Sequence, residues 1–211
     1  STQDRTLFPY TTLFRSGVVL KPLDIVTTAG GIGDIYGAMR TLPGTQTVGE
    51  DGRLFVRGGD ASESRTFIDG MAVEKPYYST MPDIPTRGRF SPFMFSGTLF
   101  SSGGYSAEYG QALSSALILN TTDMPERSLA SISLMSVGIG GGYTGRWKNS
   151  SLTVDGSYTN LGPYYRLVPQ NTEWNGNPDG IDGMMRFQQK TRETGLLKCF
   201  LSYSHGNSSM N

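Results

Sequence analysis

The sequence is poor in charge and contains no long apolar run. Only 17% of its 211 residues are charged, and 18 basic residues balance 18 acidic ones. A chain without net positive charge lacks the basic surface on which nucleic-acid binding depends, so we expect no nucleic-acid partner. No run of 18 apolar residues is present, which excludes a transmembrane helix. Membrane-crossing β-strands still agree with this composition, because their alternating pattern gives only a weak hydropathy signal.

Residue types that carry out chemistry are also scarce. Cys199 is the only cysteine, so neither an internal disulfide nor a cysteine-based metal cluster can form. His205 is the only histidine and lies in a polar segment, which argues against a Ser-His catalytic pair. Gly31, Gly33 and Gly37 approach a dinucleotide-binding fingerprint, but the third glycine is one place late and no βαβ pattern surrounds them. We therefore expect no catalytic or metal-binding residues and no cofactor.

Glycine and aromatic residues are abundant, as in turn-rich β proteins. There are 28 glycines, and aromatic residues make up 11% of the chain. After an extended segment over residues 17–28, Asp34 is suited to cap a short helix. Apolar residues at i, i+3, i+4 and i+7 from Ile35 give this helix one apolar face, and Pro43-Gly44 ends it.

Two Asp-Gly pairs, Asp51-Gly52 and Asp69-Gly70, predict tight hairpin turns, because these residues tolerate the positive φ that such turns require. Residues 75–102 carry prolines among many aromatic residues, so we expect an irregular segment there. We expect residues 17–123 to form the only compact unit. The predicted strands of this unit are residues 45–48, 53–57, 65–68, 71–73 and 114–120.

After a polar break at residues 124–127 the pattern becomes strictly alternating. Leu152, Val154 and Tyr158 alternate with polar residues over about ten residues, the length that a tilted strand needs to cross a bilayer. A second alternating set covers residues 197–203, and residues 132–139 form a third, less regular strand. Residues 129–211 have room for about four strands of this length. A soluble β-sandwich would show similar alternation.

Five motifs resemble the plug signature of TonB-dependent outer-membrane receptors. The first three are LPGTQ at residues 42–46, LFVRGGD at 54–60 and TFIDGM at 66–71. RGRFSPF at 87–93 and GGYSAEYGQALSS at 103–115 resemble later plug elements of such receptors from Bacteroidota. Each motif alone is weak, but their order and spacing are specific. The resemblance extends over residues 22–203.

The resemblance implies an α+β plug domain followed by antiparallel β-strands of a truncated outer-membrane β-barrel. The implied domains are residues 17–127 for the plug and 128–211 for the first barrel strands. The implied function is energised uptake of a small substrate across the outer membrane, the substrate being an iron chelate, cobalamin, a glycan or a peptide, with no enzymatic activity. The TonB complex would bind a segment absent from this chain. Two alternatives stay open: a β-rich surface binding module and a glycan-acting enzyme.

The resemblance also indicates candidate site residues in the plug. Charge-assisted hydrogen bonds from plug arginines to carboxylates of the barrel wall would hold the plug while leaving it able to move. Local pairing or solvation of the arginines, and simple turn geometry for the glycines, are the alternatives. The candidates are Arg57, Gly58, Gly59, Asp60, Arg65, Asp69, Gly70, Arg87 and Arg89.

Residues 6–16 read TLFPYTTLFRS and resemble the translation of a sequencing adapter. A foreign leader of this kind is excluded from reasoning about the fold. We therefore treat residues 1–16 as an artefactual leader and expect the natural sequence to begin near Gly17.

Overall fold

A computed structural model describes residues 17–49, 51–78, 86–135, 137–167, 174–191 and 195–210. The proposed leader at residues 1–16 lies outside the described residues. The chain divides into two compact units, residues 1–123 and 124–211. The expectation of a single compact unit was therefore wrong, because the strands after residue 124 pair with one another into a sheet of their own. No helix among the described residues is long and apolar enough to span a bilayer.

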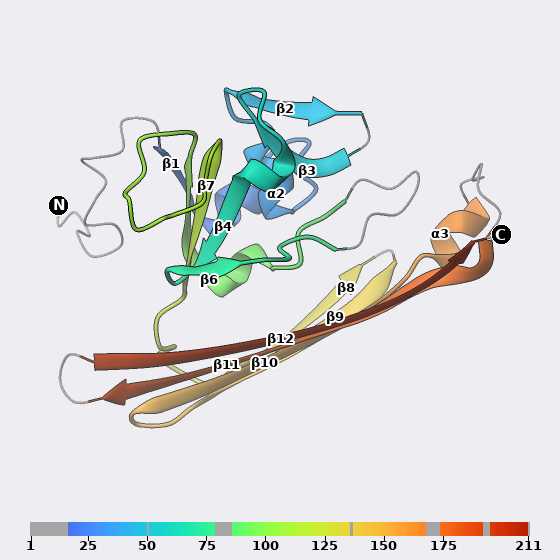
Figure 1. The fold of residues 1–211 in the computed structure, drawn as a ribbon. Helices are drawn as coiled ribbons and strands as arrows, with labels where there is room; N and C mark the ends of the chain where they lie inside the picture. Colours follow the sequence, from blue (N-terminus) through green and yellow to red (C-terminus); the bar gives the residue numbers. More distant parts are fainter. Residues whose placement is uncertain are drawn as a thin grey trace. The chain divides into compact units, whose positions relative to one another are not determined.

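The first unit is built on a five-stranded sheet with the strand order β1-β6-β7-β4-β5 (Figure 1). Neighbouring strands are antiparallel except for β4 and β7, which are parallel. A separate antiparallel pair is formed by β2 and β3. The strands are β1 (Gly17–Leu20), β2 (Thr45–Val48), β3 (Asp51–Val56), β4 (Ser64–Ile68), β5 (Met71–Val73), β6 (Phe95–Ser101) and β7 (Ser115–Thr121). The helical segments are α1 (Pro22–Thr27), α2 (Ile35–Met39) and the 3-10 turns η1 (Ala61–Glu63) and η2 (Pro92–Met94).

The core of this unit lies on both faces of β7. Ala116 and Ile118 pack with Phe67 and Leu99, and side chains of the segment between β6 and β7 pack against this cluster. Leu117 lies on the opposite face, since side chains alternate along a strand. That face is also buried. Burial on both sides explains why residues 116–119 form a continuous apolar run instead of an alternating one.

Several elements of the first unit agree with the sequence predictions. Asp34 caps α2, because its carboxylate accepts a hydrogen bond from the Gly37 amide at 2.9 Å. The Asp69-Gly70 hairpin is present: Ile68 pairs with Met71, and both turn residues have positive φ, 47° and 85°. The strands predicted near residues 53–57, 65–68 and 115–120 are observed as β3, β4 and β7.

Three predictions in the first unit were wrong. Residues 22–27 form helix α1 instead of extended structure, because Pro22 is favourable in a first helical turn and the Asp24 carboxylate accepts a hydrogen bond from the Lys21 amide at 2.9 Å. Asp51 and Gly52 do not form the turn but belong to β3, in which Asp51 pairs with Val48 of β2. Gly52 instead permits close backbone contact, since a Cβ there would overlap the carbonyl oxygen of Thr86.

The third error concerns β6. Within the proline-rich segment, residues 95–101 form a strand between β1 and β7. The prolines lie before this strand and not in it, so they remove no donor from its ladder.

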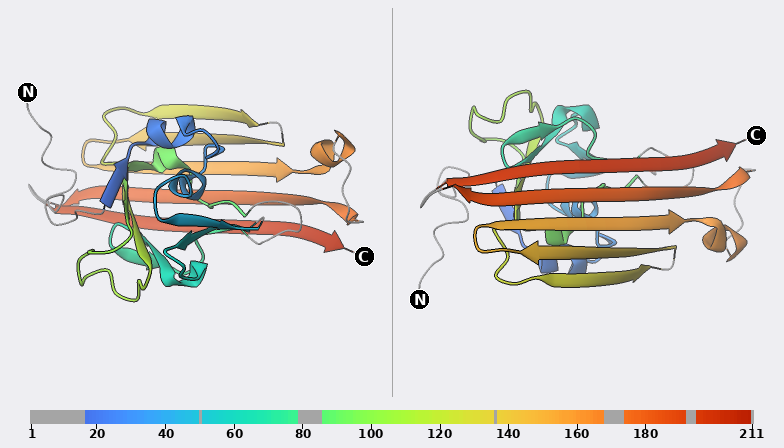
Figure 2. Two further views of the ribbon diagram at one scale, coloured as in Figure 1. Left: turned by 90° about the horizontal axis from the view of Figure 1, so that it is seen from above. Right: turned by 90° about the horizontal axis from the view of Figure 1, so that it is seen from below.

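The second unit is a five-stranded antiparallel meander in chain order, β8 to β12 (Figure 2). The strands are β8 (Leu129–Met135), β9 (Gly138–Arg146), β10 (Ser150–Asn160), β11 (Trp174–Thr191) and β12 (Gly195–Met210). Helix α3 (Gly162–Leu167) lies in the connection from β10 to β11. The predicted strand at residues 132–139 is instead the β8–β9 hairpin, in which Met135 pairs with Gly138. This extra turn gives five strands where about four were expected.

Candidate functional site

The loop after β3 holds four of the candidate site residues. Arg57 has φ of 50° and Gly58 has φ of 80°, so the chain reverses sharply at this point. The Gly59 amide closes the turn by donating to the Val56 carbonyl at 2.9 Å. Gly59 also lets the Glu63 side chain lie close to the backbone, because a Cβ on Gly59 would lie 2.5 Å from Oε2 of Glu63. The positive φ of Gly58 favours glycine at that position, and Gly59 lacks room for a side chain because its Cβ would also lie 2.7 Å from Cβ of Ser114.

A second motif loop, between β6 and β7, meets this first loop. A Cβ built on Gly103 would lie 3.3 Å from Nη1 of Arg57, so the guanidinium lies beside the Gly103 backbone. The amides of Leu113 and Ser114 both donate to the Glu63 carbonyl, at 3.0 and 3.2 Å. The structure therefore brings together two motifs that are separated by more than forty residues in the sequence.

Arg57 stands out among the candidate arginines. Its backbone amide donates to the Gly44 carbonyl at 2.9 Å, and its side chain is exposed. The guanidinium makes no hydrogen bond or ion pair with any residue that the structure describes. A non-glycine residue in the left-handed region costs conformational energy, of the order of 1 kcal/mol. An exposed cation is thus held in a strained backbone position next to the second motif loop.

The other three candidate arginines contact groups within their own unit. Arg65 lies 3.7 Å from the Glu74 carboxylate. Arg87 donates to the Ile32 carbonyl at 2.8 Å, and Arg89 donates to the Lys75 carbonyl at 3.1 Å. These contacts tie neighbouring loops together.

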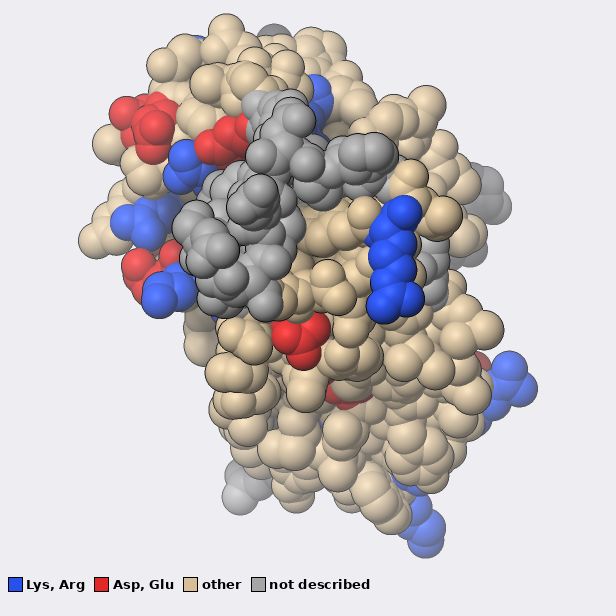
Figure 3. Space-filling view, turned by 90° about the vertical axis from the view of Figure 1, so that its right-hand side faces the viewer, with Lys and Arg blue, Asp and Glu red and all other residues tan. Residues whose placement is uncertain are grey.

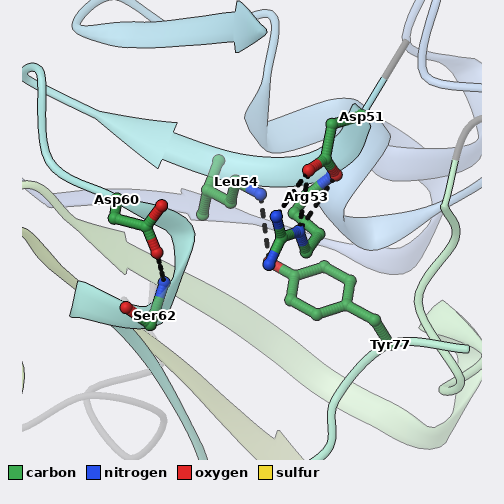
Figure 4. Close-up of polar contacts among 6 residues, drawn as sticks. All are labelled: Asp51, Arg53, Leu54, Asp60, Ser62 and Tyr77. Atoms are coloured by element: carbon green, nitrogen blue, oxygen red, sulfur yellow. Dashed lines mark hydrogen bonds and ion pairs between the residues drawn. The ribbon is translucent and has the colours of Figure 1, made fainter. Parts of the chain in front are cut away.

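Acidic residues around β3 and its following loop are stabilised as carboxylates (Figure 4). Asp60 accepts a hydrogen bond from the Ser62 amide at 2.9 Å, and this bond lowers the pKa of the exposed Asp60 carboxyl. The Arg53 guanidinium donates to both oxygens of Asp51, at 2.8 and 3.1 Å. That pairing lowers the pKa of Asp51 and raises the pKa of Arg53. The negative charges therefore serve local structure.

The Asp69-Gly70 turn lies at the far end of β4, away from the Arg57 loop. The Asp69 carboxylate accepts hydrogen bonds from the Thr121 amide at 3.0 Å and from the Thr121 hydroxyl at 2.5 Å. The Asp69 amide donates to the Leu119 carbonyl at 3.0 Å. Asp69 thus holds the last residues of β7, at the end of the first unit, against the β4–β5 turn.

A buried polar group that the sequence analysis did not select lies around Tyr36. The Tyr36 hydroxyl is 2.9 Å from the Thr66 hydroxyl, and the Tyr36 ring centroid is 4.4 Å from that of Tyr77. Tyr77 accepts a hydrogen bond from the Leu54 amide at 3.1 Å (Figure 4). Burial raises the pKa of both phenols above the ordinary value. No spacing rule in the sequence connects these residues, since they come from α2, β4 and an irregular segment.

Asp34 joins the same region to the RGRFSPF motif. Its second carboxylate oxygen accepts a hydrogen bond from the Gly88 amide at 3.0 Å. Gly88 has no room for a side chain, because a Cβ there would lie 2.5 Å from the Tyr36 ring. The cap of α2 therefore also positions Arg87 and Arg89.

The sheet of the second unit has two chemically different faces. Cross-strand register places Leu134, Ile139, Tyr158 and Ile181 in one row across four strands. Another row on that face joins Tyr143, Val154, Met185 and Leu201. These side chains are well exposed, and no charged residue occurs in the two rows.

The opposite face of the same strands is polar. Asp155, Asp182, Arg186, Gln188 and Lys198 belong to it by alternation. The Ser151 hydroxyl donates to the Gln188 side chain at 3.2 Å, a cross-strand bond on this face. One apolar and one polar face on strands of membrane length is the pattern of a barrel wall between lipid and a wet interior.

Charge is sparse over the molecule as a whole. Most of the surface in Figure 3 is neither acidic nor basic, in line with the low content of charged residues.

Comparison with solved structures identifies the fold. The chain is similar to a mutant of the ferric enterobactin receptor PfeA from Pseudomonas aeruginosa (TM-score 0.63, 14% identity, 95% of this chain and 34% of that one). It is also similar to the siderophore receptor PirA from Acinetobacter baumannii (TM-score 0.64, 14% identity, 92% and 32%) and to the copper transporter OprC (TM-score 0.58, 15% identity, 92% and 30%). No protein-family model and no curated protein matches the sequence.

These matches support the fold predicted from the motifs. The chain has an α+β unit with the fold of a plug domain, followed by antiparallel strands arranged like the first barrel strands of these receptors, and the sheet is not closed among the described residues. It spans about a third of the length of the receptors that it matches.

Proposed function

We propose that this chain is part of a TonB-dependent outer-membrane receptor that takes up a small substrate with energy supplied through TonB. The observation that carries the proposal is the combination of a plug-like sheet with a two-faced meander in one chain. A plug fold alone would suit many binding modules. A meander with exposed apolar rows alone would suit any membrane barrel. A barrel that is closed by an internal plug needs both the plug fold and the two-faced strands.

The receptors with a similar fold are named for ferric enterobactin, siderophore and copper substrates. We infer a substrate of comparable size for this protein, drawn from iron chelates, other metal complexes, cobalamin, glycans or peptides. Because the chain spans about a third of the matched receptors, selectivity would arise largely in loops and wall strands that it does not include.

The candidate arginines have different roles in this proposal. Arg65, Arg87 and Arg89 hold plug loops together through the local contacts described above. Arg57 is the candidate for a contact with a wall carboxylate, because its guanidinium has no partner among the described residues. A charge-assisted bond of this kind is strong enough to seat a plug, yet one such bond can be broken by force.

The test is uptake by the full-length receptor in its own host. The parent gene is deleted, and uptake of labelled iron chelates, cobalamin, oligosaccharides and peptides is measured. We expect loss of uptake for one class, restoration by a plasmid copy, and no restoration in a strain without TonB. A parent protein found in the soluble fraction, or uptake that does not depend on TonB, would contradict the proposal and favour a surface binding module.

A further inference from the structure

The apolar face of the second unit ends in two aromatic side chains, Tyr143 and Trp147, which form a platform at the β9–β10 turn. A Cβ built on Gly145 would lie 3.1 Å from Cη2 of Trp147 and 3.4 Å from Cε1 of Tyr143. Both aromatic rings therefore fold over the space that the glycine leaves. Trp147 is 55% exposed and Tyr143 is 59% exposed. The Trp147 amide donates to the Ser150 carbonyl at 2.8 Å, which fixes the turn that carries the indole.

One cationic side chain, that of Lys148, lies beside this platform, whereas Arg146 pairs with Ser151 and belongs to the polar face. Arg146 donates to the Ser150 carbonyl at 3.2 Å and is thereby held at the turn. Lys148 is exposed and makes no hydrogen bond or ion pair with any residue that the structure describes. No acidic residue occurs in residues 144–151. The platform thus combines two exposed aromatic rings with an unneutralised positive charge.

The other end of the sheet has a different character. There β11 and β12, with 18 and 16 residues, extend beyond the 11 residues of β10. The row at which β10 ends is polar and consists of Asn160, Asp179 and Asn207. The long connection with α3 also lies at that end (Figure 2). The exposed apolar rows therefore lie between the Trp147 turn and this polar row. At the far end, β11 and β12 continue past the polar row.

Barrels of this kind have short turns on the periplasmic side and longer loops on the outer side. The connection at residues 147–149 is a short turn by this criterion, so the platform would lie at the inner leaflet. Tryptophan and tyrosine favour the boundary between headgroups and acyl chains, and a neighbouring lysine attracts anionic headgroups.

We propose that Trp147 and Lys148 form a binding site for the phosphate headgroup of an anionic phospholipid in the inner leaflet. The indole lies at the acyl-chain boundary on the Gly145 platform. The Lys148 ammonium pairs with the headgroup phosphate, and Arg146 holds the turn through its bond to the Ser150 carbonyl. This site rests on the proposed outer-membrane function, because it requires the apolar face to meet lipid.

The experiment is native mass spectrometry of the full-length receptor in detergent, with added phosphatidylglycerol, phosphatidylcholine or lipid A. We expect preferential retention of phosphatidylglycerol. Lys148→Gln should weaken that retention about five-fold, the factor that corresponds to the ~1 kcal/mol a basic residue gains near an anionic surface. Lys148→Arg should keep the preference, because it keeps the charge.

Lys190→Gln is the matched control. Lys190 is also exposed and lies at the same end of the sheet, but it shares the polar face with Arg186 and Gln188, so its loss should leave the preference unchanged. Heat-shift electrophoresis verifies folding of each variant. Three results would overturn the site: Lys148→Gln that behaves as wild type, Lys148→Arg that loses the preference, or lipid A bound in place of phosphatidylglycerol. If the outer-membrane proposal itself fails, no variant will retain any lipid, including phosphatidylcholine.

Discussion

Replacing Asp69 should strongly destabilise the plug unit. Its carboxylate accepts two hydrogen bonds from Thr121, which is itself buried. Hydrogen bonds to a charged group contribute ~1.5–3 kcal/mol each. In addition, Asp69 has φ of 47°, a conformation that Asp tolerates better than Ala. Because two bonds to one residue are not additive, we expect Asp69→Ala to cost about 3–5 kcal/mol, a large part of a typical stability of ~5–15 kcal/mol.

Two other variants separate the causes. Asp69→Asn keeps tolerance of the left-handed conformation and one acceptor oxygen, so it should cost about 1–2 kcal/mol. Gly70→Ala changes only the backbone preference, because a Cβ there meets nothing within 4 Å. We expect it to cost about 1 kcal/mol.

The assay is equilibrium urea unfolding of the chain in mild detergent, followed by near-ultraviolet circular dichroism of its aromatic residues. We expect the loss of stability to be largest for Asp69→Ala, smaller for Asp69→Asn and smallest for Gly70→Ala. If Asp69→Ala were within about 1 kcal/mol of wild type, the Thr121 bonds would contribute no more than an ordinary neutral hydrogen bond. The assignment of Asp69 as the residue that fastens β7 would then be refuted.

Three further outcomes are expected. Burial raises the pKa of Tyr36 and Tyr77, so the stability that comes from their neutral forms is present below pH 10.0 and is lost as pH rises above it. Phenolate absorbance should show that these two tyrosines ionise only when the protein unfolds. Ionisation of either one in the folded state would contradict this. The chain alone should form no stable channels in liposomes, since β8 and β12 leave open edges that lipid cannot satisfy, and reproducible conductance would point to an oligomeric barrel. In the full-length receptor, Arg57→Gln should reduce energised uptake at unchanged folding, unlike Arg89→Gln, which should mainly lower thermal stability.

Local signals in the sequence predicted the elements that local chemistry determines. Asp34 caps its helix because a carboxylate satisfies free amide groups wherever it precedes a helix. Asp69-Gly70 forms its hairpin because both residues accept positive φ. The alternation at residues 150–160 follows from the two environments of a barrel strand. Each of these signals acts within a few residues.

The errors arose where distant contacts decide the outcome. Gly52 looks like a turn residue, yet its position is set by the backbone of Thr86, more than thirty residues away. β6 was missed because its partners β1 and β7 are distant in sequence. The Tyr36 group was missed for the same reason, since it is assembled from three separate segments. Of the candidate site, the sequence indicated the residues but not that Arg65, Arg87 and Arg89 have local partners whereas Arg57 does not.

The most direct test of the central claim uses the two faces of β12. In a full-length receptor whose only cysteine is Cys199, a fluorophore at that position is compared with one at Ser202→Cys in a Cys199→Ser background. Cys199 belongs to the apolar face and Ser202 to the polar face. If the strands form a barrel wall, lipids with nitroxide-labelled acyl chains should quench the probe at 199 and leave the probe at 202 largely unquenched. Equal quenching at both positions, or equal reaction of both thiols with a water-soluble maleimide, would contradict the account.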